Sequence, residues 1–390
     1  MPQTDRSRLP GGLWCFGIMV VLGVSDALRG VFLPVLREHF AMSQTQGAWL
    51  IMLSYISNLL FLAVGGTVID RVGRKGFFGA VMLIWMTALL LYALTDSVLT
   101  LFCGMLLSLG ASTMLSTTVN LTTPLLFLSP AMMVNLFNFG QGIGISAAQN
   151  LGGRFSDRFS AWQSANLLML GAGVILLVML IPQHMPSAPA TQAKKPPLKE
   201  IFRVPAAKYL LMMIGLYAVA EHGLQNWLVT YGSESLGFSR EQSAKYLSYF
   251  FLGITAGRLI FAPLVQRAGI RRALTLFICS GAALYIAGML LRRTGIWLVC
   301  ASGLAFSVIW PTMILMIGTF YPEAQRGAAT SWISGLANLF DIAFNAGFGP
   351  LTALLGLNTA ILVLPVCMLG CPIALLLLLR FPAYEASPAD

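Results

Sequence analysis

The sequence contains few charged residues for its length. Only 10% of its 390 residues are Asp, Glu, Lys or Arg, whereas a soluble domain carries roughly 25%. Hydrophobic residues make up 57% of the chain, and the mean hydropathy is +0.79. Such a composition cannot give a water-exposed surface to most of the chain, so a string of soluble domains is excluded.

Several signatures of catalysis and metal binding are also missing. The six cysteines fall inside apolar segments and lack metal-type spacing, so we expect neither disulfides nor a metal site. No glycine-rich nucleotide loop or lysine-bearing phosphate loop occurs, which argues against ATP as the energy source. The sequence shows no cluster of His and carboxylate residues of the kind that forms an active site. We therefore expect neither an enzyme nor a cofactor.

Long apolar segments recur along the whole chain. A bilayer core of about 30 Å requires about 20 apolar residues per helix. Such segments lie near 12–34, 47–69, 77–95, 98–121, 131–153, 163–182, 207–231, 243–264, 273–291, 296–320, 327–351 and 358–380. The intervening stretch 183–206 is rich in proline and lysine, as in a flexible linker. The pattern predicts an all-α integral membrane protein of twelve transmembrane helices, with one six-helix half at 1–182 and the other at 207–390.

Lys and Arg are concentrated on every second loop. Because cytoplasmic loops keep an excess of these residues, both termini and the linker are predicted to be cytoplasmic in a bacterial-type inner (plasma) membrane. The net charge of +10 is thus explained by topology, and we expect no nucleic-acid partner. Trp14, Trp49, Trp162 and Trp297 near segment ends suit the membrane interface.

The chain resembles itself when it is shifted by 196 residues, from position 43 to position 239. The matching pairs are Ser43 with Ser239, Gln46 with Gln242, Arg71 with Arg267, Gly73 with Gly269 and Lys75 with Arg271. The Ser-x-x-Gln spacing is that of a capping box at a helix start. Two parallel halves are a known transporter plan in which the solute binds near the membrane midplane, at the interface of the repeats.

A stretch between the second and third segments resembles the loop signature of the major facilitator superfamily. It reads Gly66-Thr67-Val68-Ile69-Asp70-Arg71-Val72-Gly73-Arg74-Lys75. We interpret Gly66, Asp70, Arg71, Gly73, Arg74 and Lys75 as a gating loop, in which the glycine allows close helix approach and the cations hold the cytoplasmic side. The resemblance implies two six-helix halves related by pseudo-two-fold symmetry and transport by alternating access.

Shorter stretches are similar to the fucose permease (fucose:proton symporter) branch of that superfamily. They are Tyr217, Glu221 and Trp227, then Gly257-Arg258, Trp310-Pro311 and Gly142-Ile143-Gly144. Two acids of that branch are absent. Gly30 stands four residues before Pro34, with Asp26 one turn earlier, and Ser116 stands four residues before Asn120. The branch implies proton-coupled symport of a sugar, although its usual coupling acids are missing.

Ionisable residues inside the segments are the strongest functional candidates, because an ion at mid-bilayer costs about 2.5 kcal/mol or more. We predict proton-coupling roles for Asp26, Glu221 and Asp341, and solute or anion binding for Arg29 and Arg258. Asp26 and Arg29 share a helix face, so a purely structural ion pair is an open alternative. Arg258 has the same structural alternative. His222 cannot share the face of its neighbour Glu221, and we favour Glu221.

Polar and aromatic residues inside the segments complete the predicted solute site. They are Asn120, Asn138, Gln141, Gln225, Asn338, Asn345, Trp227 and Trp310. Amides suit hydroxyl-rich solutes, and indole rings can stack on a sugar, although aromatic residues more often pack between helices.

We expect a secondary active transporter that moves a small polar solute, a sugar or related metabolite, by proton symport. Alternatives are an organic-anion symporter that uses Arg29 and Arg258, or a drug or metabolite exporter driven by proton antiport. The expected partners are the small-molecule solute, protons and the lipid bilayer, and the protein is expected to be a monomer.

Overall fold

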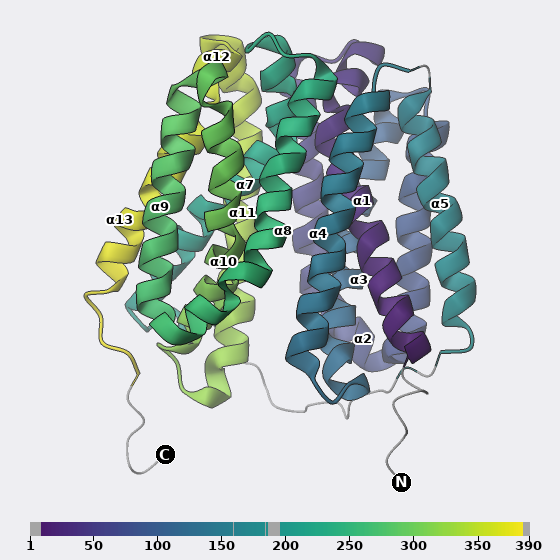
Figure 1. Cartoon of the computed structure of the whole chain (residues 1–390). Coiled ribbons are helices and arrows are strands. Elements are labelled where there is room, and N and C mark those ends of the chain that lie inside the picture. Colours follow the sequence, from purple (N-terminus) through teal and green to yellow (C-terminus); the bar gives the residue numbers. More distant parts are fainter. Residues whose placement is uncertain (1–8, 159, 184, 186–195, 385–390) are drawn as a thin grey trace. The chain divides into compact units, whose positions relative to one another are not determined.

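The computed structural model describes residues 9–158, 160–183, 185 and 196–384 of the chain (Figure 1). All the regular elements of these residues are helices. They form two compact units. Residues 184 and 186–195 of the predicted linker lie outside the described part.

The first unit consists of five helices and the start of a sixth. The five are α1 (Leu9–His39), α2 (Gln44–Leu94), α3 (Val98–Leu126), α4 (Pro130–Phe155) and α5 (Ala161–Leu180). Residues Phe238–Ser248, which include the first turns of α8 (Arg240–Ala268), belong to the same unit. A division of the chain at the linker would place these residues in the second half. The domain limits drawn from the sequence stay a prediction.

The second unit contains the remainder of α8 and the helices that follow the linker. These are α6 (Leu198–Ile201), α7 (Ala206–Glu234), α9 (Ile270–Leu290), the short 3-10 helix η2 (Arg292–Gly295), α10 (Ile296–Gly318), α11 (Glu323–Leu355), α12 (Leu357–Ala360) and α13 (Val363–Leu378). Each of the twelve apolar segments predicted from the sequence corresponds to a helix. The second and third of them are joined in α2.

The same helix pairs pack together inside each unit. In the first unit α1 packs on α4 and α5, and α2 packs on α3 and α5. In the second unit α7 packs on α11 and α13, and α9 packs on α10 and α13. These are equivalent pairs when the chain is shifted by half its length, so the sequence repeat corresponds to a repeated packing scheme.

Two glycines of the repeat have almost the same unusual backbone conformation. Gly73 has φ 74° and ψ 159° and interrupts α2, while Gly269 has φ 79° and ψ 157° and separates α8 from α9. This region of backbone space is essentially reserved for glycine. The turn between the second and third spans therefore has the same backbone conformation as the turn between α8 and α9. Both turns require glycine.

Both predicted capping boxes are present. The backbone N–H of Ser43 donates to Oε1 of Gln46 at 2.8 Å, and the Gln46 N–H donates to Oγ of Ser43 at 3.2 Å. Ser239 and Gln242 make the same two bonds, each at 3.1 Å. Each box satisfies donors that a helix start leaves unpaired, so α2 and α8 begin at the residues that the sequence indicates.

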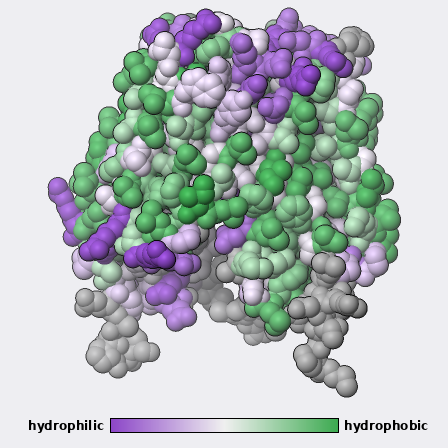
Figure 2. Space-filling model, viewed as in Figure 1, coloured by the Kyte–Doolittle hydropathy of each residue, from purple (hydrophilic) through white to green (hydrophobic). Residues whose placement is uncertain are grey.

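The surface carries a broad apolar band. Figure 2 shows hydrophobic side chains over the middle of the helices and hydrophilic ones gathered toward their ends. Large apolar side chains such as Leu83, Ile175, Leu276 and Leu376 are more than half exposed. Eight helical segments within the described residues are long and apolar enough to cross a membrane. Lipid is the solvent that suits this surface.

Four further long helices, α4, α7, α8 and α11, are more polar than those eight. They have 26, 29, 29 and 33 residues, enough to span the bilayer. Many of the predicted solute and proton residues lie on them. Polar groups in a membrane helix face protein or water, so we expect the solute and proton site on these helices.

We predict that replacing Gly269 with Ala destabilises the protein. The added methyl group meets no atom within 4 Å, so the cost comes from the backbone conformation and should be about 1–3 kcal/mol. The measurement is the thermal unfolding midpoint of the purified protein in detergent.

Gly171→Ala is the matched control. Gly171 lies inside α5, where an added methyl group also meets nothing within 4 Å, and Ala favours the helix by about 1 kcal/mol. Its midpoint should stay unchanged or rise. Equal midpoints for Gly269→Ala and the unaltered protein would contradict the argument.

Candidate functional site

A histidine and an aspartate join α7 to α11 in the second unit. Nδ1 of His222 lies 2.9 Å from Oδ2 of Asp341. Asp341 is buried, with 1% of its surface exposed, whereas the His222 side chain keeps 34% of its exposure. The second carboxylate oxygen, Oδ1, is buried and has no hydrogen-bond partner among the described residues. The pair thus combines a partly exposed imidazole with a buried carboxylate of which one oxygen has a hydrogen-bond partner.

Sequence reasoning selected Asp341 but set His222 aside in favour of Glu221. Adjacent residues on one helix do point in different directions. Of these two residues, His222 is the one whose side chain reaches α11 and bonds to Asp341. A carboxyl in an apolar helix needs a partner. A search for a titratable residue on each neighbouring helix would therefore have found His222.

Asn345 and Trp227 extend the contact between α7 and α11. The indole N–H of Trp227 donates to Oδ1 of Asn345 at 3.3 Å, and Nδ2 of Asn345 donates to the backbone carbonyl of Asp341 at 2.9 Å. The Trp227 ring is fully buried and packs on Phe348, with 4.6 Å between ring centroids. Trp227 therefore orients Asn345 beside Asp341, and its ring face is occupied by packing.

Glu221 lies in an aromatic environment on the same helix. It is half-buried, and it acts electrostatically on the hydroxyl of Tyr217, as does Arg258 of α8. The Tyr217 hydroxyl donates to the backbone carbonyl of Phe306 at 3.2 Å. Trp310 is half-buried, with its ring centroid 6.4 Å from that of Tyr217. The structure thus brings Glu221, Arg258 and Trp310 around one tyrosine.

Asp26 and Arg29 of the first unit do not form the direct ion pair that their spacing allows. Oδ2 of Asp26 accepts a hydrogen bond from the Ser112 hydroxyl of α3 at 3.0 Å. Arg29 is only 8% exposed, and its Nε and Nη1 atoms have no hydrogen-bond partner within the described part of the chain. The arginine is therefore available for another acceptor.

The predicted amides differ in their engagement. The side chains of Asn138 and Asn338 donate to carbonyls of their own helices. Oδ1 of Asn120 is buried without a partner among the described residues, while Gln141 is half-buried and Gln225 is 8% exposed. Asn120 is thus the amide with the clearest spare acceptor.

The predicted gating loop is described in part. Lys75 donates from Nζ to the backbone carbonyl of Ile181 at 2.6 Å, where a cation complements the end of α5. Gly73 makes the break described above, and Arg74 is half-buried. The side chains at Gly66, Asp70 and Arg71 lie outside the described residues.

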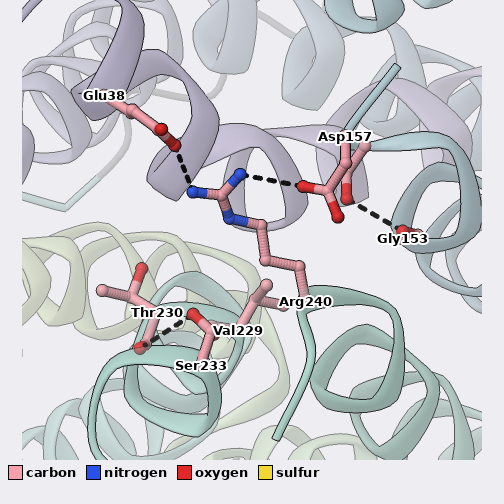
Figure 3. Close-up of polar contacts among 8 residues, drawn as sticks. Glu38, Gly153, Asp157, Val229, Thr230, Ser233 and Arg240 are labelled. Atoms are coloured by element: carbon pink, nitrogen blue, oxygen red, sulfur yellow. Dashed lines mark hydrogen bonds and ion pairs between the residues drawn. The ribbon is translucent and has the colours of Figure 1, made fainter.

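A cluster of opposite charges holds the start of α8 in the first unit. Nη1 of Arg240 lies 2.8 Å from Oδ1 of Asp157, and Nη2 bonds to Glu38 (Figure 3). Partial burial lowers the pKa of Arg240, but the hydrogen bonds to Glu38 and Asp157 outweigh it and raise that pKa above its usual value. Both carboxylates are about two-thirds exposed. Such contacts contribute about 1 kcal/mol or less, so they position α8 more than they stabilise the unit.

Comparison with known proteins shows the family to which the chain belongs. A family model described as Major Facilitator Superfamily matches residues 15–339. The uncharacterized MFS-type transporter YceJ of Bacillus subtilis (strain 168) is 25% identical over 358 residues, which is 86% of each chain. The 3-(3-hydroxy-phenyl)propionate transporter of Escherichia coli (strain K12) is 26% identical over 278 residues, 68% of this chain and 67% of that one.

Solved structures share the fold. A D-xylose-proton symporter superposes with a TM-score of 0.79 at 13% identity, covering 96% of this chain and 98% of that chain. The E. coli fucose:proton symporter FucP gives 0.69 at 14% identity, covering 95% and 99%. At such identities the likeness is one of fold alone. Because the family model covers most of the sequence, this chain belongs to the Major Facilitator Superfamily, and it is a membrane transporter and not an enzyme.

Proposed function

We propose that this transporter carries a small polar solute, a sugar or related metabolite, by proton-coupled symport with alternating access. The observation that carries the proposal is the His222–Asp341 pair. Its nitrogen and oxygen lie 2.9 Å apart, on two helices whose length suits the bilayer. A titratable pair in such helices is the usual mark of a proton path.

The pair changes its net charge when it binds a proton. With one proton bound, an imidazolium next to a carboxylate is neutral overall. Without the proton, a neutral imidazole leaves Asp341 negative, 1% exposed and with Oδ1 unpaired. A buried negative charge is costly, so the conformation that admits water is favoured after proton release. Proton binding at His222 and Asp341 thereby biases the conformational equilibrium.

The surroundings of Glu221 fit a hydroxyl-rich solute. Its carboxylate, the Arg258 guanidinium and the Trp310 ring gather around Tyr217. Charged acceptors and donors bind sugar hydroxyls strongly, and an aromatic ring can cover the apolar face of a sugar. Two structures of the same fold are named as xylose and fucose symporters. We infer from this set of groups that the solute binds near Glu221.

A second candidate substrate is an organic acid. One relative is named as the transporter of an aryl propionate, and Arg258 supplies a cation in the middle of α8. In that case the guanidinium would bind the carboxylate of the substrate directly.

The distribution of Lys and Arg supports a bacterial-type inner membrane with both termini in the cytoplasm. We also propose that the protein works as a monomer. Each unit has its own buried core, which includes Trp14, Trp85 and Phe137 in the first unit and Tyr217, Trp227 and Phe306 in the second.

Asp341→Asn is expected to abolish accumulation driven by a pH gradient, while counterflow exchange of the solute continues. The amide keeps the shape of the side chain and can bond to His222, but it cannot take up a proton. The measurement is uptake of labelled sugar into proteoliposomes with the interior more alkaline than the outside.

Asp96→Asn provides the control. Asp96 is exposed between α2 and α3, so the variant that lacks its charge should accumulate the solute normally. His222→Gln should resemble Asp341→Asn. Normal accumulation by Asp341→Asn would remove the pair from the coupling mechanism.

The cargo is tested with a panel of sugars and aromatic or aliphatic acids in the same vesicles. A sugar should be accumulated, and Arg258→Gln should raise its KM about tenfold through the loss of one charge-assisted contact. If acids alone are accumulated and Arg258→Gln abolishes their binding, the organic-acid alternative is correct and the sugar proposal is wrong.

A further inference from the structure

The first unit contains a small cavity that the proposed proton pair and solute site do not use. Its volume is about 30 Å³. A cavity needs about 10–15 Å³ of such space to hold a water molecule, so this one has room for one small particle and excludes a ligand of many atoms. Its walls come from α1, the end of α2 and the early turns of α3 and α5.

Arg29 provides the charge in this cavity. The side chain is more than nine-tenths buried, and its Nε and Nη1 atoms have no hydrogen-bond partner among the described residues. A buried guanidinium with two unpaired donors is unfavourable. The cavity therefore lies beside a positive charge that lacks a bonded counterion within the described part of the chain.

Asp26 does not serve as that bonded counterion. It lies close enough to Arg29 to interact electrostatically, yet its carboxylate accepts a hydrogen bond from Ser112 at 3.0 Å. No direct ion pair joins Asp26 to Arg29 in the part of the structure that is described. The guanidinium donors thus remain free for an acceptor in the cavity.

Trp162 adds a further unpaired donor to the wall. It is 6% exposed, and its indole N–H lacks a hydrogen-bond partner in the described residues. Two other polar groups of the wall are already engaged. The Tyr92 hydroxyl donates to Ser108 at 2.8 Å, and Nδ2 of Asn166 donates to the backbone carbonyl of Trp162 at 2.8 Å. The buried unpaired side-chain atoms of the wall, within the described residues, are all donors.

The remaining wall is hydrocarbon. Its apolar side chains are Leu28, Phe32, Leu36, Leu101 and Met105. They separate the guanidinium from bulk water, and a low local dielectric strengthens the attraction between a positive charge and an anion. The occupant that suits this cavity is therefore small, negatively charged and able to accept hydrogen bonds.

We propose that this cavity binds a single monovalent halide ion, with chloride as the biological ligand, beside the Arg29 guanidinium. A halide is one atom, only slightly larger than a water molecule, and it accepts hydrogen bonds from any direction. Carboxylates and phosphates contain too many atoms for the volume. The bound ion neutralises a buried charge and lies among side chains of four helices, so it stabilises the first unit.

The test is the thermal unfolding midpoint of the full chain in detergent, while sodium chloride replaces sodium gluconate at fixed pH. Constant ionic strength keeps the screening of surface charges equal. We expect a saturable rise of about 2 °C or more with chloride, and a similar rise with bromide. Methanesulfonate, a larger monovalent anion, should give none. Equal midpoints in chloride and gluconate would show that water alone fills the cavity and would overturn the proposal.

Arg29→Gln should lose the saturable rise with chloride, because the variant lacks the positive charge. Arg272→Gln is the matched control, since Arg272 is exposed at the start of α9 in the second unit, and it should keep the full rise. The same saturable rise in a folded Arg29→Gln variant would contradict the halide site.

Bromide locates the ion directly if Arg29→Gln does not fold. Crystals of the unaltered chain grown in sodium bromide should give an anomalous scattering peak in the cavity, beside the guanidinium. A bromide peak elsewhere with none in the cavity would overturn the proposal. Both readouts are independent of transport, so failure of the symport proposal would leave the halide site intact.

Discussion

The structure depends on one constraint, which is that lipid cannot solvate a charge or an unpaired polar group. Apolar side chains therefore cover the outside of the helices, and the few ionisable groups must find partners inside. The bond between His222 and Asp341 is the clearest result of this constraint. Where the partner is incomplete, as at Oδ1 of Asp341 or at the Arg29 guanidinium, the protein retains a group that can bind a proton or a ligand.

Much of the fold follows from the sequence, because the bilayer makes hydropathy a strong signal. All twelve predicted apolar segments are helical, two of them within the single helix α2, and the capping boxes at Ser43 and Ser239 formed as their spacing indicated. Local chemistry determines these features. The attachment of the first turns of α8 to the first unit could not be foreseen, since it depends on contacts of Arg240 with residues far away in the chain.

The candidate site was harder to predict, because helix-face arguments treat one helix at a time. They favoured Glu221 over His222, although His222 is the residue that bonds to Asp341 of α11. They also assigned Trp14 and Trp162 to the membrane interface, whereas the structure buries both. In each case the deciding contact joins residues more than a hundred positions apart, and spacing along one helix contains no information about it.

The torsion angles at Gly73 and Gly269 recur at Gly356, where α11 ends and α12 begins, with φ 73° and ψ 157°. Almost every substitution would strain this conformation. Each of these glycines fixes the direction in which the chain leaves one helix and enters the next. A change at any of them therefore acts on the tilt of two helices at once, although the glycine itself contacts no solute.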